Sequence, residues 1–122
     1  MSAPNLILTN NIYGNTIFYQ ANGAASQVMA NVLTNAASSG LSYKLNTIMV
    51  ANPNAVNVPI GVDVFRNGVG NFLAANTTVP GYSSLVVQAK DTAIYLLEGD
   101  SLRCNVAAGY TCHFTISFET IS

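Results

Sequence analysis

The sequence predicts an all-β protein, a single antiparallel β-sandwich of jelly-roll type. From residue 40 onward apolar and polar residues alternate with a period of two, the side-chain period of a strand. Turn residues interrupt these runs every ~8 to 12 residues, as expected for a sandwich. No stretch shows a long helical period. A length of 122 residues suits one domain over residues 1–122, in which residues 1–40 show the weaker pattern.

Two strands are expected within the first forty residues. Thr16–Gln20 alternates as a strand does. Ser26–Thr34 also fits helical spacing, but its β-branched content and its lack of charged residues favour a strand. Gly40 closes the small-residue stretch that follows.

The next strand is expected over Ser42–Asn52. Its alternation places Ile48 and Val50 on one face, and Thr47 and Met49 on the other. Both faces are partly apolar, which is typical of a strand inside a packed assembly.

The following run, residues 60–66, points three aliphatic side chains to one face and Asp63 to the other. Asn67 and Gly68 both tolerate positive φ and predict a tight turn. We interpret residues 68–71 as part of that hairpin connection. Five further strands are expected in residues 72–79, 83–89, 93–97, 101–107 and 110–119, with Leu85 and Val87 sharing one face.

The charge composition argues against two classes of partner. Only 7% of residues are charged, against roughly a quarter in an average soluble domain. The net charge is −1, and the four basic residues Lys44, Arg66, Lys90 and Arg103 are scattered. Neither nucleic acid nor an anionic membrane surface is therefore an expected partner. Low charge favours a protein that packs against copies or other proteins.

We expect neither a secretory signal nor a membrane span. The N-terminal residues have no basic region and only a three-residue apolar run. No stretch approaches the ~20 apolar residues of a membrane helix. We therefore expect the chain to be made and folded in a reducing cytoplasm.

The single histidine, His113, is not expected to be catalytic. Its parity places it on the polar face of its strand with Thr115, Ser117 and Glu119. Cys112 falls on the opposite face, so the two side chains cannot form a nucleophile and base pair.

The two cysteines, Cys104 and Cys112, share core-facing parity. We expect them side by side across a hairpin closed by residues 107–110 and buried as small hydrophobic thiols. A cross-strand disulfide is the alternative.

An acidic turn, Leu97, Glu98, Gly99, Asp100 and Ser101, is the most distinctive short stretch. With Asp91 nearby, Glu98 and Asp100 raise the question of a paired-carboxylate or calcium site, but calcium takes six to eight oxygens from a shaped loop and residues 90–101 supply too few. We expect a structural turn with solvated carboxylates. Gly99 would supply an unusual backbone conformation, and Asp100 or Ser101 would accept from nearby amides. Leu97 and Leu102 would anchor the flanking strands; no catalytic, cofactor or metal residue is predicted.

Short motifs over roughly residues 40–122 resemble small virion structural proteins of tailed bacteriophages, including cyanophages. The matching stretches are Ala51-Asn52 at a strand end, Leu97 to Ser101, and Ser117 to Ser122 at the C-terminus. A Gly-Asp turn before the penultimate strand is also similar to jelly-roll subunits of the C1q and tumour-necrosis-factor type. That second similarity bears on fold, not on function.

The phage resemblance implies a capsid decoration (cement) protein without enzymatic activity, located in the virion. Its partners would be the major capsid protein or other virion proteins, and it would assemble as a homo-oligomer, with a trimer favoured. A neck, tail or fibre component of the virion is one alternative. A carbohydrate- or receptor-binding module is another, because an Asn- and Tyr-rich β surface can hydrogen-bond sugars. No cofactor is implied.

Overall fold

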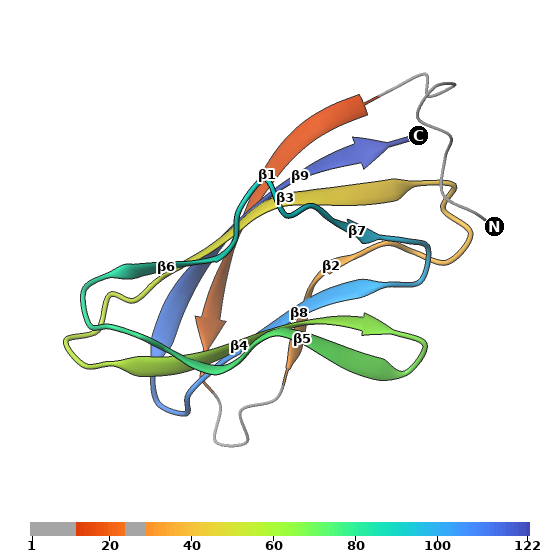
Figure 1. Cartoon of the computed structure of the whole chain (residues 1–122). Helices are drawn as coiled ribbons and strands as arrows, with labels where there is room; N and C mark the ends of the chain where they lie inside the picture. Colours follow the sequence, from red (N-terminus) through yellow and green to blue (C-terminus); the bar gives the residue numbers. More distant parts are fainter. Residues whose placement is uncertain (1–11, 24–28) are drawn as a thin grey trace.

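The computed structural model describes residues 12–23 and 29–122. These residues form two stacked sheets and no helix, as Figure 1 shows. The predicted all-β sandwich is confirmed. The strands are β1 (Ile12–Asn22), β2 (Ala30–Thr34), β3 (Ser42–Ala51), β4 (Val58–Arg66), β5 (Val69–Val79), β6 (Ser84–Gln88), β7 (Ile94–Leu96), β8 (Ser101–Val106) and β9 (Thr111–Ile121).

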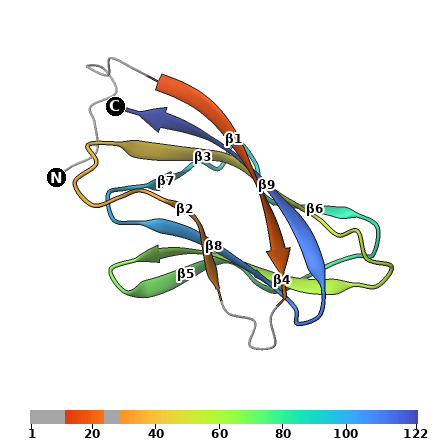
Figure 2. The ribbon, with the colours of Figure 1, turned by 180° about the vertical axis from the view of Figure 1, so that it is seen from behind.

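All strand pairs are antiparallel, and one series of them is nested in the sequence. Sheet A has the order β1-β9-β3-β6, with β7 also paired to β3, and sheet B has the order β2-β8-β4-β5. The pair β4–β5 is innermost, followed by β3 with β6 and β7, then β2–β8, and finally β1–β9. The chain is thus one long hairpin rolled into two layers, which is the jelly-roll topology (Figure 2).

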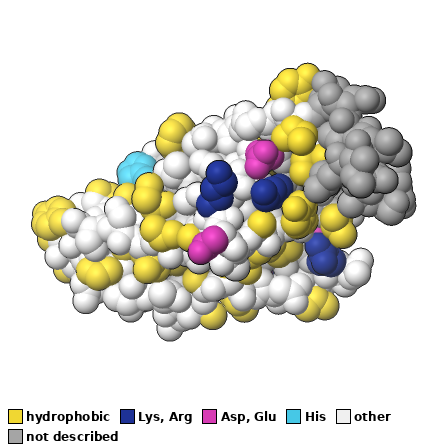
Figure 3. Space-filling view, turned by 45° about the horizontal axis from the view of Figure 1, so that its top comes forward, with side chains coloured by type: hydrophobic (Ala, Val, Ile, Leu, Met, Phe, Trp, Pro, Cys, Tyr) yellow, Lys and Arg dark blue, Asp and Glu magenta, His cyan; other side chains and the backbone are white. Residues whose placement is uncertain are grey.

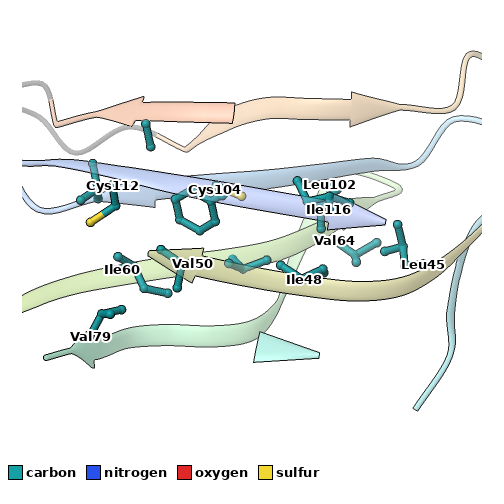
Figure 4. Close-up of a cluster of buried hydrophobic side chains, with 14 of the residues drawn as sticks. Leu45, Ile48, Val50, Ile60, Val64, Val79, Leu102, Cys104, Cys112 and Ile116 are labelled. Carbon is teal, nitrogen blue, oxygen red and sulfur yellow. The ribbon is translucent and has the colours of Figure 1, made fainter. Parts of the chain in front are cut away.

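The core lies between the inward faces of the two sheets. Alternation places Ile48 and Val50 of β3 opposite Ile60 and Val62 of β4, and all four are at most 1% exposed. Figure 4 shows such side chains from both layers meeting in one cluster. Burying one aliphatic side chain of this size contributes about 1.5–3 kcal/mol. The face assignments for residues 42–52 and 60–66 are confirmed.

The β4–β5 hairpin turns at Asn67 and Gly68, whose φ angles are +53° and +77°. This is the predicted turn, but it is shorter than expected. Val69 already pairs with Arg66, so residues 69–71 belong to β5 and not to the connection.

The N-terminal strands fall where the alternation placed them. Thr16–Gln20 lies within β1, and the end of Ser26–Thr34 forms β2 from Ala30. Residues 26–28 of that predicted strand lie outside the described residues.

A buried asparagine holds each of two crossings between the sheets. At one crossing, Asn52 Nδ2 donates to the carbonyls of Val56 and Val79, at 2.9 and 3.0 Å. At the other, Asn35 Nδ2 donates to the carbonyls of Leu41 and Leu96, also at 2.9 and 3.0 Å. Asn52 thereby links the β3–β4 connection to the end of β5, and Asn35 links the β2–β3 connection to the end of β7. Buried carbonyls that are not paired within a sheet receive hydrogen-bond donors in this way.

Candidate functional site: the outer face of sheet A

The acidic turn joins β7 in sheet A to β8 in sheet B. Gly99 has a φ of +89°, the left-handed conformation that its sequence position predicted. Asp100 accepts a hydrogen bond from the Leu97 amide at 2.8 Å and two from Arg66 Nε at 3.0 and 2.9 Å. These bonds to the carboxylate raise the pKa of Arg66 above its ordinary value. Asp100 is therefore occupied by structural contacts.

The same turn is fixed to the connection between β2 and β3. The Gly99 amide donates to the Asn35 carbonyl at 2.7 Å, and the Asn35 amide donates to the Asp100 carbonyl at 2.9 Å. Glu98 accepts from the Gly40 amide at 2.6 Å. The expectation of solvated carboxylates is wrong for Asp100, which is 2% exposed.

The apolar anchors of the turn differ by one position from the prediction. Leu102 is fully buried, as expected. On the β7 side the buried residue is Leu96, whereas Leu97 is 36% exposed. The chain leaves sheet A after Leu96, so the alternation of inward and outward side chains does not extend to Leu97.

Cys104 and Cys112 lie in different sheets, so the expected hairpin arrangement is wrong. β8 pairs with β2 and β4, and β9 pairs with β1 and β3, because residues 107–110 cross from one layer to the other. Both thiols are free and buried in the core, where Figure 4 shows them. Burial raises the pKa of Cys104 to about 12, with a further contribution from the charge of Asp63. Such a thiol is a poor nucleophile.

His113 is exposed, and Cys112 beside it is fully buried. Their predicted placement on opposite faces of β9 is confirmed. In the register of sheet A, His113 stands between Gln20 of β1 and Ala51 of β3. Neither neighbour has a carboxylate or thiol that would pair with an imidazole base.

Residues 12–23 and 29–122 contain no group of three or more His, Cys, Asp or Glu side chains that could hold a metal ion. None of their secondary structure is a helix long and apolar enough to cross a membrane.

A row of outward-facing side chains crosses sheet A, with exposed residues at its two ends and the partly exposed Thr115 and Met49 between them. The strand registers pair Phe18 of β1 with Thr115 of β9, Thr115 with Met49 of β3, and Met49 with Val86 of β6. Phe18 is 79% exposed and Val86 is 55% exposed. We call these four residues the apolar row. It places three hydrophobic side chains in line across four strands.

The residues around the apolar row are almost all neutral. On one side, Thr16 and Ser117 share a hydrogen bond between their hydroxyls at 3.2 Å. Further along, Lys44 and Glu119 lie 3.9 Å apart and offset each other's charge. Figure 3 shows this side of the molecule, with basic side chains beside acidic ones and hydrophobic side chains distributed between neutral ones. The face is therefore close to electrically neutral.

The outer face of sheet B is held by an ion pair. Arg103 Nε donates to Asp63 Oδ1 at 2.8 Å, and the guanidinium stacks 4.2 Å from the centre of the Phe65 ring. The hydrogen bonds to Asp63 raise the pKa of Arg103. Gly70 of the neighbouring strand leaves room, because a Cβ there would lie 2.5 Å from Asp63 Oδ2.

The apolar row could not be found by sequence reasoning alone. Strand parity indicates that Phe18, Met49 and Val86 each point outward. It does not show that the three are neighbours, since this depends on pairings between residues far apart in the chain.

No protein-family model matches the chain, and no curated protein matches it in sequence. Among solved structures, it is similar to a chain described under "Bacillus endospore appendages form a novel family of disulfide-linked pili". The two share 12% sequence identity with a TM-score of 0.51, over 98% of this chain and 95% of that one. The likeness supports the sandwich fold.

Proposed function

We propose that this protein is a non-enzymatic structural component of a tailed-phage virion, a capsid decoration protein that docks through the outer face of sheet A. The apolar row is the observation that carries this proposal. Sequence motifs at Ala51-Asn52, Leu97–Ser101 and Ser117–Ser122 support the virion assignment.

The chemistry of the face fits a protein partner. Aromatic residues and methionine are enriched at protein interfaces, whereas charged residues are depleted at their centres. Phe18 and Met49 supply the first property. The Lys44–Glu119 pair leaves no net charge to be buried at the edge of the face.

Docking would reinforce the shell by adding buried area across the boundaries between capsid subunits. A stable contact of this kind buries about 1,200–2,000 Å² in total. Local opening of the shell then breaks more contacts than it would in an undecorated particle. The proposed homotrimer multiplies this effect, since three linked copies dissociate less readily than one.

The structural neighbour adds one supporting point. Its description names a pilus, so the same sandwich fold serves in a polymeric structural protein. At 12% identity, the neighbour supports an assembly role by analogy of fold alone.

A charge placed in the apolar row tests the docking face. Purified Phe18→Lys protein is added to virions lacking the protein, and bound copies are measured by sedimentation. We expect at least about a tenfold loss of affinity, since each factor of ten is ~1.4 kcal/mol and a buried aromatic anchor contributes more. The matched control is Phe72→Lys, because Phe72 is also exposed, at 59%, but lies on β5 of sheet B.

Undiminished binding of the Phe18→Lys protein would overturn the docking face. An equal loss in both variants would overturn it as well. Thermal unfolding of both variants shows whether they remain folded, and light scattering tests the oligomer. A clean monomer at micromolar concentration contradicts the trimer.

A further inference from the structure

A hollow of about 430 Å³ lies on the outer face of sheet B. Its floor forms where Gly61 of β4 stands opposite Asn105 of β8 in the strand register. A Cβ on Gly61 would overlap Oδ1 of Asn105, so the amide of Asn105 lies across the glycine. The absence of a side chain at Gly61 opens the hollow, and a polar amide borders it.

The wall of the hollow comes from β5. Phe72 is 59% exposed and, like Asn76, lines the hollow. The β4–β5 register shifts twice near Val62, and such irregularities turn side chains away from regular strand directions. Asn76 has a φ of +51°, a conformation that asparagine tolerates better than most residues. The bulged part of β5 thus sets an aromatic ring and an amide around one depression.

The lining excludes an ionic ligand. It consists of Pro59, Ile60, Gly61, Phe72, Ala75, Asn76 and Asn105, with no ionisable side chain. Asp63 and Arg103, each two residues along its strand from Gly61 or Asn105, are bound to each other. A phosphate or carboxylate would find no cation among the lining residues, and a purely apolar ligand would make no use of the polar amides that line the hollow.

A pyranose ring matches these features. It has an apolar C–H face that can cover an aromatic ring and a rim of hydroxyls that can both donate and accept. Asn76 and Asn105 each carry an amide oxygen and an amide nitrogen, which are an acceptor and a donor. The volume also lies within the ~300–1,000 Å³ of small-molecule sites.

We propose that this hollow is a binding site for neutral hexose-containing glycans, with Phe72 as the stacking platform and the two amides as hydroxyl partners. It lies on the opposite layer from the apolar row. One copy can therefore dock through sheet A and present the glycan site outward. For such an uncharged, shallow site we expect a dissociation constant of about 1 mM, which corresponds to ~4 kcal/mol of binding free energy.

The test uses the isolated full chain, so it does not depend on the proposed virion role. Amide NMR shifts are followed while methyl hexosides of several stereochemistries are added, with a sialoside as the acidic comparison. We expect at least one neutral hexoside to shift the amides of Gly61, Ala75 and Asn105. Phe72→Ala should weaken that binding at least about tenfold, ~1.4 kcal/mol, and Phe72→Tyr should retain it.

Phe18→Lys is the matched control on the other layer and should bind sugar as the natural chain does, even where it fails to dock on particles. Three results would each overturn the glycan site. The first is sugar binding that survives Phe72→Ala, and the second is a preference for the sialoside. The third is no shift with any hexoside at about 50 mM, which is fifty times the expected dissociation constant. None of these results bears on particle docking, so the two proposals fail separately.

Discussion

Arg66 Nε donates hydrogen bonds to both carboxylate oxygens of Asp100, at 3.0 and 2.9 Å. Arg66 ends β4 in sheet B, and its Nη2 also donates to the carbonyl of Tyr95 in β7 of sheet A. A single arginine thus links the two sheets through the acidic turn. The two carboxylates around Gly99 make the turn a candidate reactive site, but this contact gives the Asp100 carboxylate a structural role.

Replacing Asp100 by alanine should lower the free energy of unfolding by about 2 kcal/mol. The change removes a nearly buried acceptor of the Leu97 amide and the partner of Arg66. Urea unfolding measures the loss. Asp91→Ala, at an exposed position, should shift stability by less than about 0.5 kcal/mol. Equal effects of the two substitutions would contradict the structural role of Asp100.

Gly99→Val should destabilise the protein through backbone strain alone. No atom lies within 4 Å of a Cβ built at Gly99, yet its φ of +89° disfavours any β-branched residue. The cost is about 1–2 kcal/mol or more. Gly14→Val is the control, because Gly14 is equally open and has no positive φ. Thermal unfolding should show a lower midpoint for Gly99→Val only; unchanged midpoints for both would rule out strain at Gly99.

Asn52→Asp should lower the free energy of unfolding far more than the same substitution at Asn57. Aspartate at position 52 loses the amide that donates to the carbonyls of Val56 and Val79, and it sets a carboxylate against them. We expect a loss of about 3 kcal/mol at neutral pH. Asn57 only accepts, from the Gly81 amide, and aspartate preserves that bond. Equal stabilities of the two variants in chemical denaturation would argue against the role of Asn52 in holding the crossing between the sheets.

Gly70→Ala should disturb the ion pair beneath it. A Cβ at position 70 would lie 2.5 Å from Asp63 Oδ2 and 2.7 Å from Arg103 Nη2. We expect the free energy of unfolding to fall by about 1–3 kcal/mol. In a double-mutant cycle, Gly70→Ala should cost less once Asp63→Ala has vacated the space. Strict additivity of the two substitutions would show that the glycine is needed for another reason.

The Cys104 thiol should make stability fall at alkaline pH. Its pKa is about 12 in the folded protein against an ordinary 9.0. Below pH ~9 the thiol is neutral in both the folded and the unfolded chain, so its full contribution to the free energy of unfolding is present. Between pH ~9 and ~12 it ionises mainly in the unfolded chain, which favours unfolding. Urea midpoints of the natural chain should decline more steeply over this interval than those of Cys104→Ala. Parallel declines would contradict burial of the thiol.

Strand positions and faces were accessible from the sequence because alternation is a local property. The turn at Asn67 and Gly68 and the conformation of Gly99 follow from residue chemistry in the same way. The sheet crossings did not follow. The chain between Cys104 and Cys112 looks like a hairpin, yet it passes from one layer to the other, so the thiols are separated.

The candidate face and the buried contacts of the turn also depend on nonlocal pairing. Phe18 and Val86 become members of one row only through the registers of β9 and β3. Likewise, nothing near Asp100 in the sequence indicates Arg66, which is 34 residues away. Parity within each strand can be read locally, but the order of strands in a rolled hairpin cannot.

Localising the protein in purified tailed-phage virions by cryo-EM tests the proposed role most directly. The account predicts many copies spread over the capsid surface, each with β1, β9, β3 and β6 of sheet A against the shell and sheet B facing outward. A ring of copies at a single vertex, contact through sheet B, or virions that lack the protein would contradict it.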